Sequence, residues 1–215
     1  MKKGFIKRVI SFVVLVLLLF SYSASDAIGS VEASGKMKTL KKNQYSKLIE
    51  GGMTKNQFET ILATVTYQNP SGLTNKQLSK VHTKTEMLNL IIYRLRGMEI
   101  YKSKQSKKQN YISIKKANKI MASFTSFRFK KNKKYSYSMY TDKKNVHMFY
   151  GAGYSDYIIT KNAKYNNEKI VITYELHDDL QEENAGKLVC RGVYKATLIK
   201  RKNGKYRLNS IKKIK

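Results

Sequence analysis

The C-terminal part of the chain carries the feature that most constrains the fold, an alternation of apolar residues with a period of two. Three segments show it, at residues 169–176, 188–200 and 205–214. Alternate side chains of a β-strand point to opposite faces, and the β-branched and aromatic residues that are frequent here favour strands. The segments therefore predict an antiparallel β-meander with one apolar face. Cys190 is expected on that face, as a small buried hydrophobic side chain.

The turn between the last two segments sets their register. A two-residue loop at Asn203-Gly204 would place Leu198 opposite Asn209. A three-residue loop, which Gly204 would end in the left-handed bulge position, would place Leu198 opposite Leu208. We favour the three-residue loop because it gives a continuous apolar face.

Upstream of residue 130 the apolar residues have helical spacing. Two capping boxes, Thr54 to Gln57 and Thr74 to Gln77, each precede apolar residues that recur every three or four positions. This pattern predicts an antiparallel helical hairpin whose second helix continues through Leu95. Ser113 is expected to cap a shorter helix over Ile114–Phe124. An earlier short helix is expected from Met37 until two glycines at positions 51 and 52.

Helices followed by strands predict an α+β protein. We expect N-terminal helices, a helical hairpin plus a short helix, packed on a C-terminal antiparallel β-meander of about five or six strands. Further strands are expected at residues 135–140, 145–150 and 154–160, and residues 101–110 are expected to form an exposed loop. The expected organisation is a signal peptide at 1–27, a disordered lead-in at 28–36, a helical segment at 37–129 and a β segment at 130–215.

The first 33 residues have the three parts of a secretory signal peptide: a basic start, an apolar run at residues 9–20, and small residues before cleavage at Ala27 or Ala33. The run is shorter than the ~20 apolar residues of a membrane span, so an uncleaved anchor, the only expected membrane contact, is the less favoured alternative. Cleavage after Ala27 leaves 39 basic and 13 acidic residues, a formal charge of +26. A secreted chain with one cysteine suits the exterior or cell wall of a Gram-positive-like bacterium.

The histidines give no support for a metal site. His82, His147 and His177 lie far apart, and none belongs to an HExxH, HxH or HxxxH pattern. A single cysteine also excludes a multi-cysteine site. We therefore expect no metal ion and no cofactor. A trio of His147, Ser155 and Asp156 can be assembled on paper, but any chain of this length offers such trios.

Five of the fourteen acidic residues lie within nine positions, at Glu175, Asp178, Asp179, Glu182 and Glu183. The segment lacks the DxDxDG spacing of a calcium loop. Glycoside hydrolases also use paired carboxylates, but these project from rigid positions, whereas this segment is expected to be a solvated hairpin loop. A hydrolase that uses these acids or His147 remains one alternative.

The strongest global signal is charge, because 43 basic residues face 14 acidic ones. The densest cluster consists of Lys130, Lys131, Lys133 and Lys134, followed by Tyr135. Such a surface attracts polyanions, and an exported chain meets teichoic acids, anionic lipid headgroups and extracellular nucleic acid. Nucleic acid would be bound only non-specifically, because the chain lacks an RNP-type stacking motif and has few arginines. With 36 lysines and 7 arginines, genome composition is an alternative source of the charge.

These observations predict a secreted, non-enzymatic binding or accessory module of the bacterial envelope. Its expected contacts with anionic polymers are Lys130, Lys131, Lys133, Lys134 and Tyr135. Two alternatives stay open: a cup of curved sheet and helices that binds a small ligand, and a hydrolase that uses the acids of the 175–183 loop. A basic surface would favour the binding module, and an apolar cavity would favour the ligand cup. A deep pocket that gathers the acids would favour the enzyme.

Overall fold

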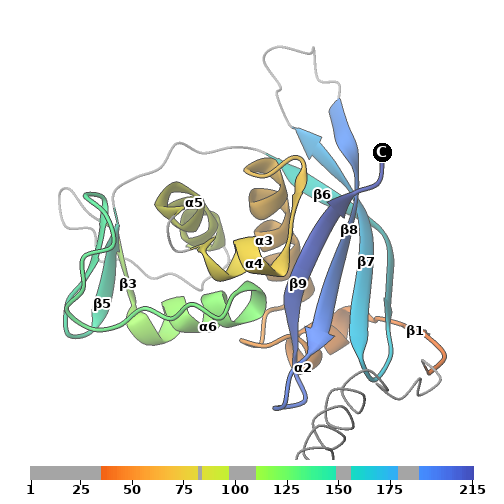
Figure 1. Cartoon of the computed structure of the whole chain (residues 1–215), viewed down its shortest axis with the longest axis horizontal. Coiled ribbons are helices and arrows are strands. Elements are labelled where there is room, and N and C mark those ends of the chain that lie inside the picture. Colours follow the sequence, from red (N-terminus) through yellow and green to blue (C-terminus); the bar gives the residue numbers. More distant parts are fainter. Residues whose placement is uncertain (1–34, 82–83, 97–109, 149–155, 179–188) are drawn as a thin grey trace, which may run out of the picture. The chain divides into compact units, whose positions relative to one another are not determined.

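The computed structural model describes residues 35–81, 84–96, 110–148, 156–178 and 189–215, and it confirms the α+β class (Figure 1). The described elements are β1 (Lys38–Thr39), the 3-10 helix η1 (Lys42–Gln44), α2 (Tyr45–Leu48), α3 (Lys55–Tyr67), β2 (Gly72–Leu73), α4 (Asn75–Ser79), α5 (Thr85–Arg96), β3 (Asn110–Ser113), α6 (Ile114–Phe124), β4 (Met139–Thr141), β5 (Asn145–Met148), β6 (Tyr157–Tyr165), β7 (Lys169–Asp178), β8 (Val189–Lys200) and β9 (Tyr206–Lys213). The expected signal peptide lies outside these ranges. Within them, no helix is long and apolar enough to cross a bilayer.

The predicted meander forms the centre of a six-stranded antiparallel sheet with the order β1-β6-β7-β8-β9-β2. Its inner face is built by the alternation seen in the sequence, since Ile170, Ile172, Tyr174 and Leu176 of β7 are all buried. The predicted three-residue loop is confirmed, because Leu198 pairs with Leu208. Gly204 in that loop has φ +76°.

Both capping boxes are confirmed. At the start of α3 the Thr54 hydroxyl accepts a hydrogen bond from the Gln57 backbone N–H, and the Gln57 side chain accepts one from the Thr54 N–H. The buried side of α3, which includes Phe58 and Leu62, packs on β6 and β7. The Thr74 box opens α4 in the same way.

The prediction of one long second helix is wrong, because α4 ends at Ser79 and α5 begins at Thr85. Leu78, Val81 and Leu88 are all buried in the same core. The apolar spacing therefore continues across the break, and periodicity alone does not reveal that the helix is interrupted. The short helix expected from Met37 is also only partly present, since β1 and η1 precede a four-residue α2.

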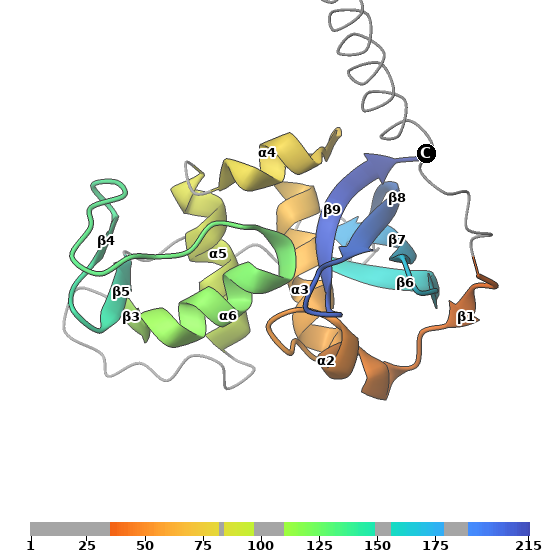
Figure 2. The same ribbon diagram turned by 60° about the horizontal axis from the view of Figure 1, so that its bottom comes forward.

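The expected strands do not all belong to one sheet. β5 pairs with both β3 and β4 in a separate antiparallel sheet of order β3-β5-β4. The first residue of β3, Asn110, lies in the segment expected to be a loop. Ser113 caps α6 as predicted, and α6 contacts β3 and β5 as well as β9 (Figure 2). The small sheet therefore packs against α6.

Candidate functional site

The four lysines of the predicted polyanion site lie in the connection between α6 and β4. Residues 130–137, called the lysine loop here, display the side chains of Lys130, Lys131, Lys133 and Lys134, all of them exposed. Among the described residues, none of these four ammonium groups forms an ion pair with a carboxylate. Their charges therefore face solvent without a counterion from the described part of the chain.

The backbone of the lysine loop is fixed by hydrogen bonds to β4. The Thr141 hydroxyl donates to the Lys130 carbonyl over 2.6 Å and accepts from the Lys133 N–H over 2.9 Å. The Thr141 N–H donates to the Lys133 carbonyl over 2.7 Å. Between these residues Asn132 adopts φ +51°, a left-handed conformation that asparagine tolerates better than most residues. The lysines thus project from an ordered platform.

Tyr135 supports this platform and is not displayed on it. Its ring makes edge-on contacts with Phe127 and Phe129, at centroid distances of 5.5 and 5.2 Å. Its hydroxyl accepts a hydrogen bond from the Lys130 N–H over 2.8 Å. The exposed ring of the loop is Tyr137, with 86% of its surface accessible. Sequence alone could not separate the two tyrosines, because both lie beside the lysines.

A shallow depression of about 490 Å³ lies next to the loop. It is lined by Asn132, Lys133, Lys134, Ser136, Tyr137, Tyr140 and Thr141. The Tyr140 ring stacks on the His147 ring, with centroids 4.7 Å apart and planes 9° from parallel. The depression therefore combines two ammonium groups with hydroxyl, amide and aromatic surface.

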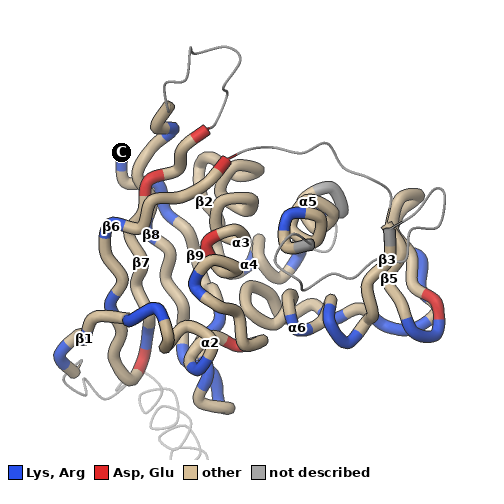
Figure 3. Tube along the Cα trace, turned by 180° about the vertical axis from the view of Figure 1, so that it is seen from behind, with Lys and Arg blue, Asp and Glu red and all other residues tan. Residues whose placement is uncertain are grey.

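Asp142 is the one acidic residue between positions 110 and 148, where ten lysines and arginines lie. Figure 3 shows the predominance of blue over red segments along α6 and the small sheet. Its Oδ2 is 2.7 Å from His147 Nε2, and its Oδ1 accepts from the N–H groups of Lys144 and Asn145 over 2.5 and 2.6 Å. The bond from His147, followed by those two N–H groups, holds the pKa of Asp142 well below its usual range. This carboxylate is bonded within the β4–β5 turn and does not pair with the lysines of the lysine loop.

The trio of His147, Ser155 and Asp156 gains no support as a site. Asp156 is buried and its Oδ2 accepts from Arg94 Nη1 over 2.8 Å. His147 is paired with Asp142, whereas Ser155 and also His82 lie outside the described residues. The two ionisable groups of the trio are thus each engaged elsewhere.

The described part of the acidic segment does not act as one cluster either. Asp178 is buried and pairs with Arg191. Glu175 lies three positions earlier on the same strand, and Lys161 Nζ is 3.0 Å from its carboxylate. Side chains an odd number of positions apart on a strand point to opposite faces. Asp179, Glu182 and Glu183 lie outside the described residues.

Cys190 is exposed, so the expectation of a buried side chain is wrong. The pairing of β7 with β8 shifts at this point: Leu176 pairs with Gly192, whereas His177 pairs with Cys190. Arg191 is the extra residue of a bulge, which turns the side chain of Cys190 to the opposite face from the one that strict alternation predicts.

No family model, no curated protein sequence and no solved structure matches this chain. The arrangement of its own side chains is the basis on which a function can be argued.

Proposed function

We propose that this protein is a secreted, non-enzymatic envelope module that binds anionic polymers through the lysine loop. The observation that carries the proposal is the charge imbalance of residues 110–148, ten basic residues against Asp142 alone, with that acid already bonded to His147. Lysines on an ordered backbone, unpaired within the described part of the chain, create a local positive potential, which concentrates polyanions and accelerates their association.

The side chains indicate which polymers fit. A lysine ammonium is a compact, strongly hydrated point charge, and it does not make the bidentate contacts by which arginine selects particular anions. Lysine-based binding therefore favours any chain of closely spaced phosphates, such as a teichoic acid, over one defined small anion. Tyr137 adds an exposed ring on which a sugar or a base can lie.

The basic region is wider than the loop. Further exposed lysines lie on α6 and in the turn between β4 and β5, at Lys115, Lys116, Lys119, Lys143 and Lys144. A flexible polymer that contacts several of these groups gains avidity, because each further contact is intramolecular. An N-terminal segment with the pattern of a signal peptide would bring this surface to the cell wall, where such polymers are found.

The packing on the inner face of the large sheet favours a binding module and not a cup that encloses a small ligand. Phe58 and Leu62 of α3 pack there with Tyr174 and Leu198, all of them fully buried. Side chains of the core thus occupy the place in which a cup would hold its ligand.

Two charge-matched variants test the proposal. The loop variant changes Lys130, Lys131, Lys133 and Lys134 to Gln, and the control variant changes four exposed lysines of the large sheet and its hairpin, Lys38, Lys164, Lys195 and Lys202. Both lose four charges, so a difference between them reports position and not net charge.

Binding to purified teichoic acid and to a DNA duplex is measured at about 50 mM salt. The loop variant should bind at least about tenfold more weakly than the wild type, because several phosphate contacts are lost together. The control variant should lose much less. Equal losses in the two variants would show that net charge alone attracts the polymer, and absence of binding by the wild type would refute the proposal.

A further inference from the structure

The bulge in β8 brings three side chains with metal-binding atoms to one face of the large sheet. Glu175 and His177 lie two positions apart on β7 and so project to the same face. Cys190 is the cross-strand partner of His177. Gly192 allows this shift because it adopts φ +143°, which a residue with a side chain rarely does.

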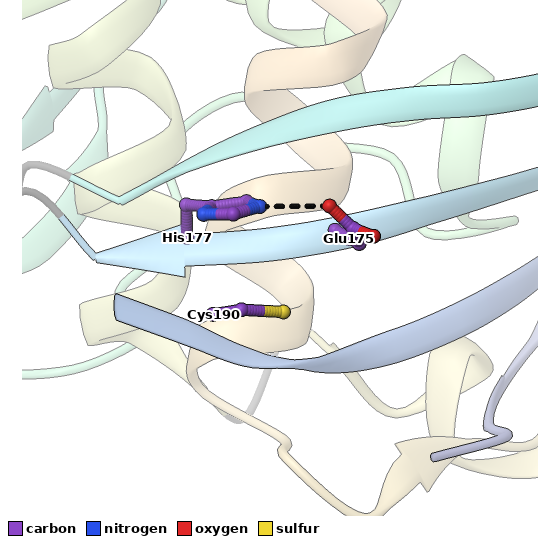
Figure 4. A group of neighbouring side chains, drawn as sticks. All are labelled: Glu175, His177 and Cys190. Carbon is purple, nitrogen blue, oxygen red and sulfur yellow. Dashed lines mark hydrogen bonds and ion pairs between the residues drawn. The ribbon is translucent and has the colours of Figure 1, made fainter. Parts of the chain in front are cut away.

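The donor atoms of these residues are close together (Figure 4). Glu175 Oε2 lies 3.0 Å from His177 Nε2, and the ligand atoms of all three residues lie within 4.8 Å of one another. The imidazole is held in place by Tyr157 of β6, whose ring stacks on it at a centroid distance of 5.6 Å, and only 8% of His177 is exposed. Cys190 and Glu175 keep the site open to solvent.

We propose that Glu175, His177 and Cys190 bind a divalent transition-metal ion of the zinc class. In a tetrahedral site with metal–ligand bonds of about 2.0–2.3 Å, neighbouring ligand atoms are roughly 3.3–3.6 Å apart. Glu175 Oε2 and His177 Nε2 are slightly closer than this, and no two of the three donors are more than 4.8 Å apart. Side-chain rotations can therefore bring the three donors to this spacing while the strands stay in place. A thiolate, an imidazole nitrogen and one carboxylate oxygen form a donor set that Zn²⁺ accepts and that Mg²⁺ and Ca²⁺ do not prefer.

The ammonium group of Lys161 would compete with a bound metal ion for the carboxylate of Glu175. Lys161 Nζ lies 3.0 Å from the same Glu175 oxygen that faces His177. The hydrogen bond from His177, followed by that from Lys161, lowers the pKa of Glu175. The Lys161 side chain is half exposed and can swing into solvent when an ion takes its place. Three protein ligands leave a coordination position for water.

Cobalt(II) provides the direct test, because a thiolate ligand produces a sulfur-to-cobalt charge-transfer absorption that oxygen and nitrogen ligands do not. We expect the reduced, tag-free full chain to develop this absorption with one equivalent of Co²⁺ and to lose it when Zn²⁺ is added. The variant Cys190→Ser should lack the band and bind at least about tenfold more weakly, in the range seen for perturbed metal sites. Because Cys190 is exposed, this variant should fold normally.

Two further variants separate a site from adventitious binding. His147→Gln removes the imidazole of the other described acid–histidine pair, with Asp142, which has no cysteine nearby, and it should leave the Co²⁺ band unchanged. Lys161→Gln removes the competing ammonium and should raise Zn²⁺ affinity severalfold, measured against a chromophoric chelator. Absence of the band in the wild type, or equal Zn²⁺ affinity in the wild type and Cys190→Ser, would overturn the proposal.

Discussion

At the scale of single residues, the protein uses its two kinds of cation differently. Three arginines make hydrogen-bonded ion pairs with acids that are mostly or fully buried: Arg94 with Asp156, Arg191 with Asp178 and Arg207 with Glu50. Arginine suits such positions because its planar group bonds two acceptors at once. The lysines of the lysine loop are exposed and unpaired in the described part of the chain. Internal pairing thus relies on the rare arginines, and the abundant lysines are left for the surface.

Asp142 gives a prediction at this scale. Its pKa is depressed by His147 and two backbone N–H groups, so it stabilises the fold at any pH above the value of about 3.9 expected in the unfolded chain. This contribution is lost as the pH falls from there toward the lower folded-state pKa. Asp142→Asn keeps an oxygen for the two backbone N–H groups, but it removes the charge and replaces the oxygen that faces His147 Nε2 by an amide NH2 group.

The free energy of unfolding of Asp142→Asn and of the wild type is to be compared by urea denaturation from pH 7 to about pH 2.5. The variant should be less stable at pH 7, and the difference should narrow below about pH 4 as the wild type loses its advantage. A difference that is constant over the whole range would mean that the charge of Asp142 does not contribute.

At the scale of elements, the β8–β9 hairpin is where sequence and structure can be compared most directly. Leu198 is fully buried opposite Leu208. Replacing a buried leucine by alanine removes apolar contacts and leaves a cavity, at a cost of roughly 2–5 kcal/mol. Leu198→Ala should lower the free energy of unfolding by that amount in urea denaturation. A loss below about 0.5 kcal/mol, the level of ordinary surface substitutions, would contradict the register and the inward position of this side chain.

The close approach of Gly51 to α6 gives a second prediction. Gly51 has φ +84°, and an added Cβ would lie 2.1 Å from the Lys119 carbonyl oxygen. Gly204 also has a positive φ, +76°, but an added Cβ there would meet nothing within 4 Å. Both alanine variants should carry backbone strain of about 1 kcal/mol or more, and Gly51→Ala should cost clearly more because α6 must shift.

Thermal and urea unfolding of the two variants measure this difference, with Gly204→Ala as the matched control. Equal losses of stability would show that the contact between Gly51 and α6 is not tight.

Local signals predicted the elements that depend on local physics. The alternation in β7, the two capping boxes and the turn at Gly204 were sufficient to predict the structure there, because side-chain direction and hydrogen bonding at these places involve near neighbours. The break between α4 and α5 was missed because Leu78 and Val81 keep the helical apolar spacing across it. The separate small sheet and the two-residue strands β1 and β2 depend on partners far along the chain, which periodicity does not identify.

In the candidate sites, too, the sequence predicts features that depend on near neighbours and misses those that depend on distant contacts. Exposure of Lys130, Lys131, Lys133 and Lys134 agrees with the charge of the segment, but the supporting position of Tyr135 follows from its contacts with Phe127 and Phe129. The proximity of Glu175, His177 and Cys190 depends on one bulge residue. A one-residue shift reverses the face of a side chain, so strict alternation placed Cys190 on the wrong side.

At the scale of the whole molecule, the formal charge of +29 is distributed unevenly. Residues 110–148 hold ten basic residues and one acid, whereas the described strands β6 to β8 contain Glu175 and Asp178, which are both paired with cations. Genome composition alone would enrich lysine in every exposed segment alike. A polymer-binding surface instead predicts that the lysines of the lysine loop contribute more to binding than equally exposed lysines elsewhere.

The salt dependence of binding tests this central claim most directly. The affinity for a DNA duplex is to be measured from about 50 to 300 mM salt, over which the Debye length shrinks from ~14 to ~6 Å, for the wild type, the loop variant and the control variant. Each phosphate contact releases a counterion and adds about −0.9 to the slope of log affinity against log salt. The four substitutions in the loop variant should therefore flatten the slope by up to about 3.6, and those in the control variant should flatten it much less. Slopes that are equal in the two variants, or a wild-type affinity that does not change with salt, would contradict the account.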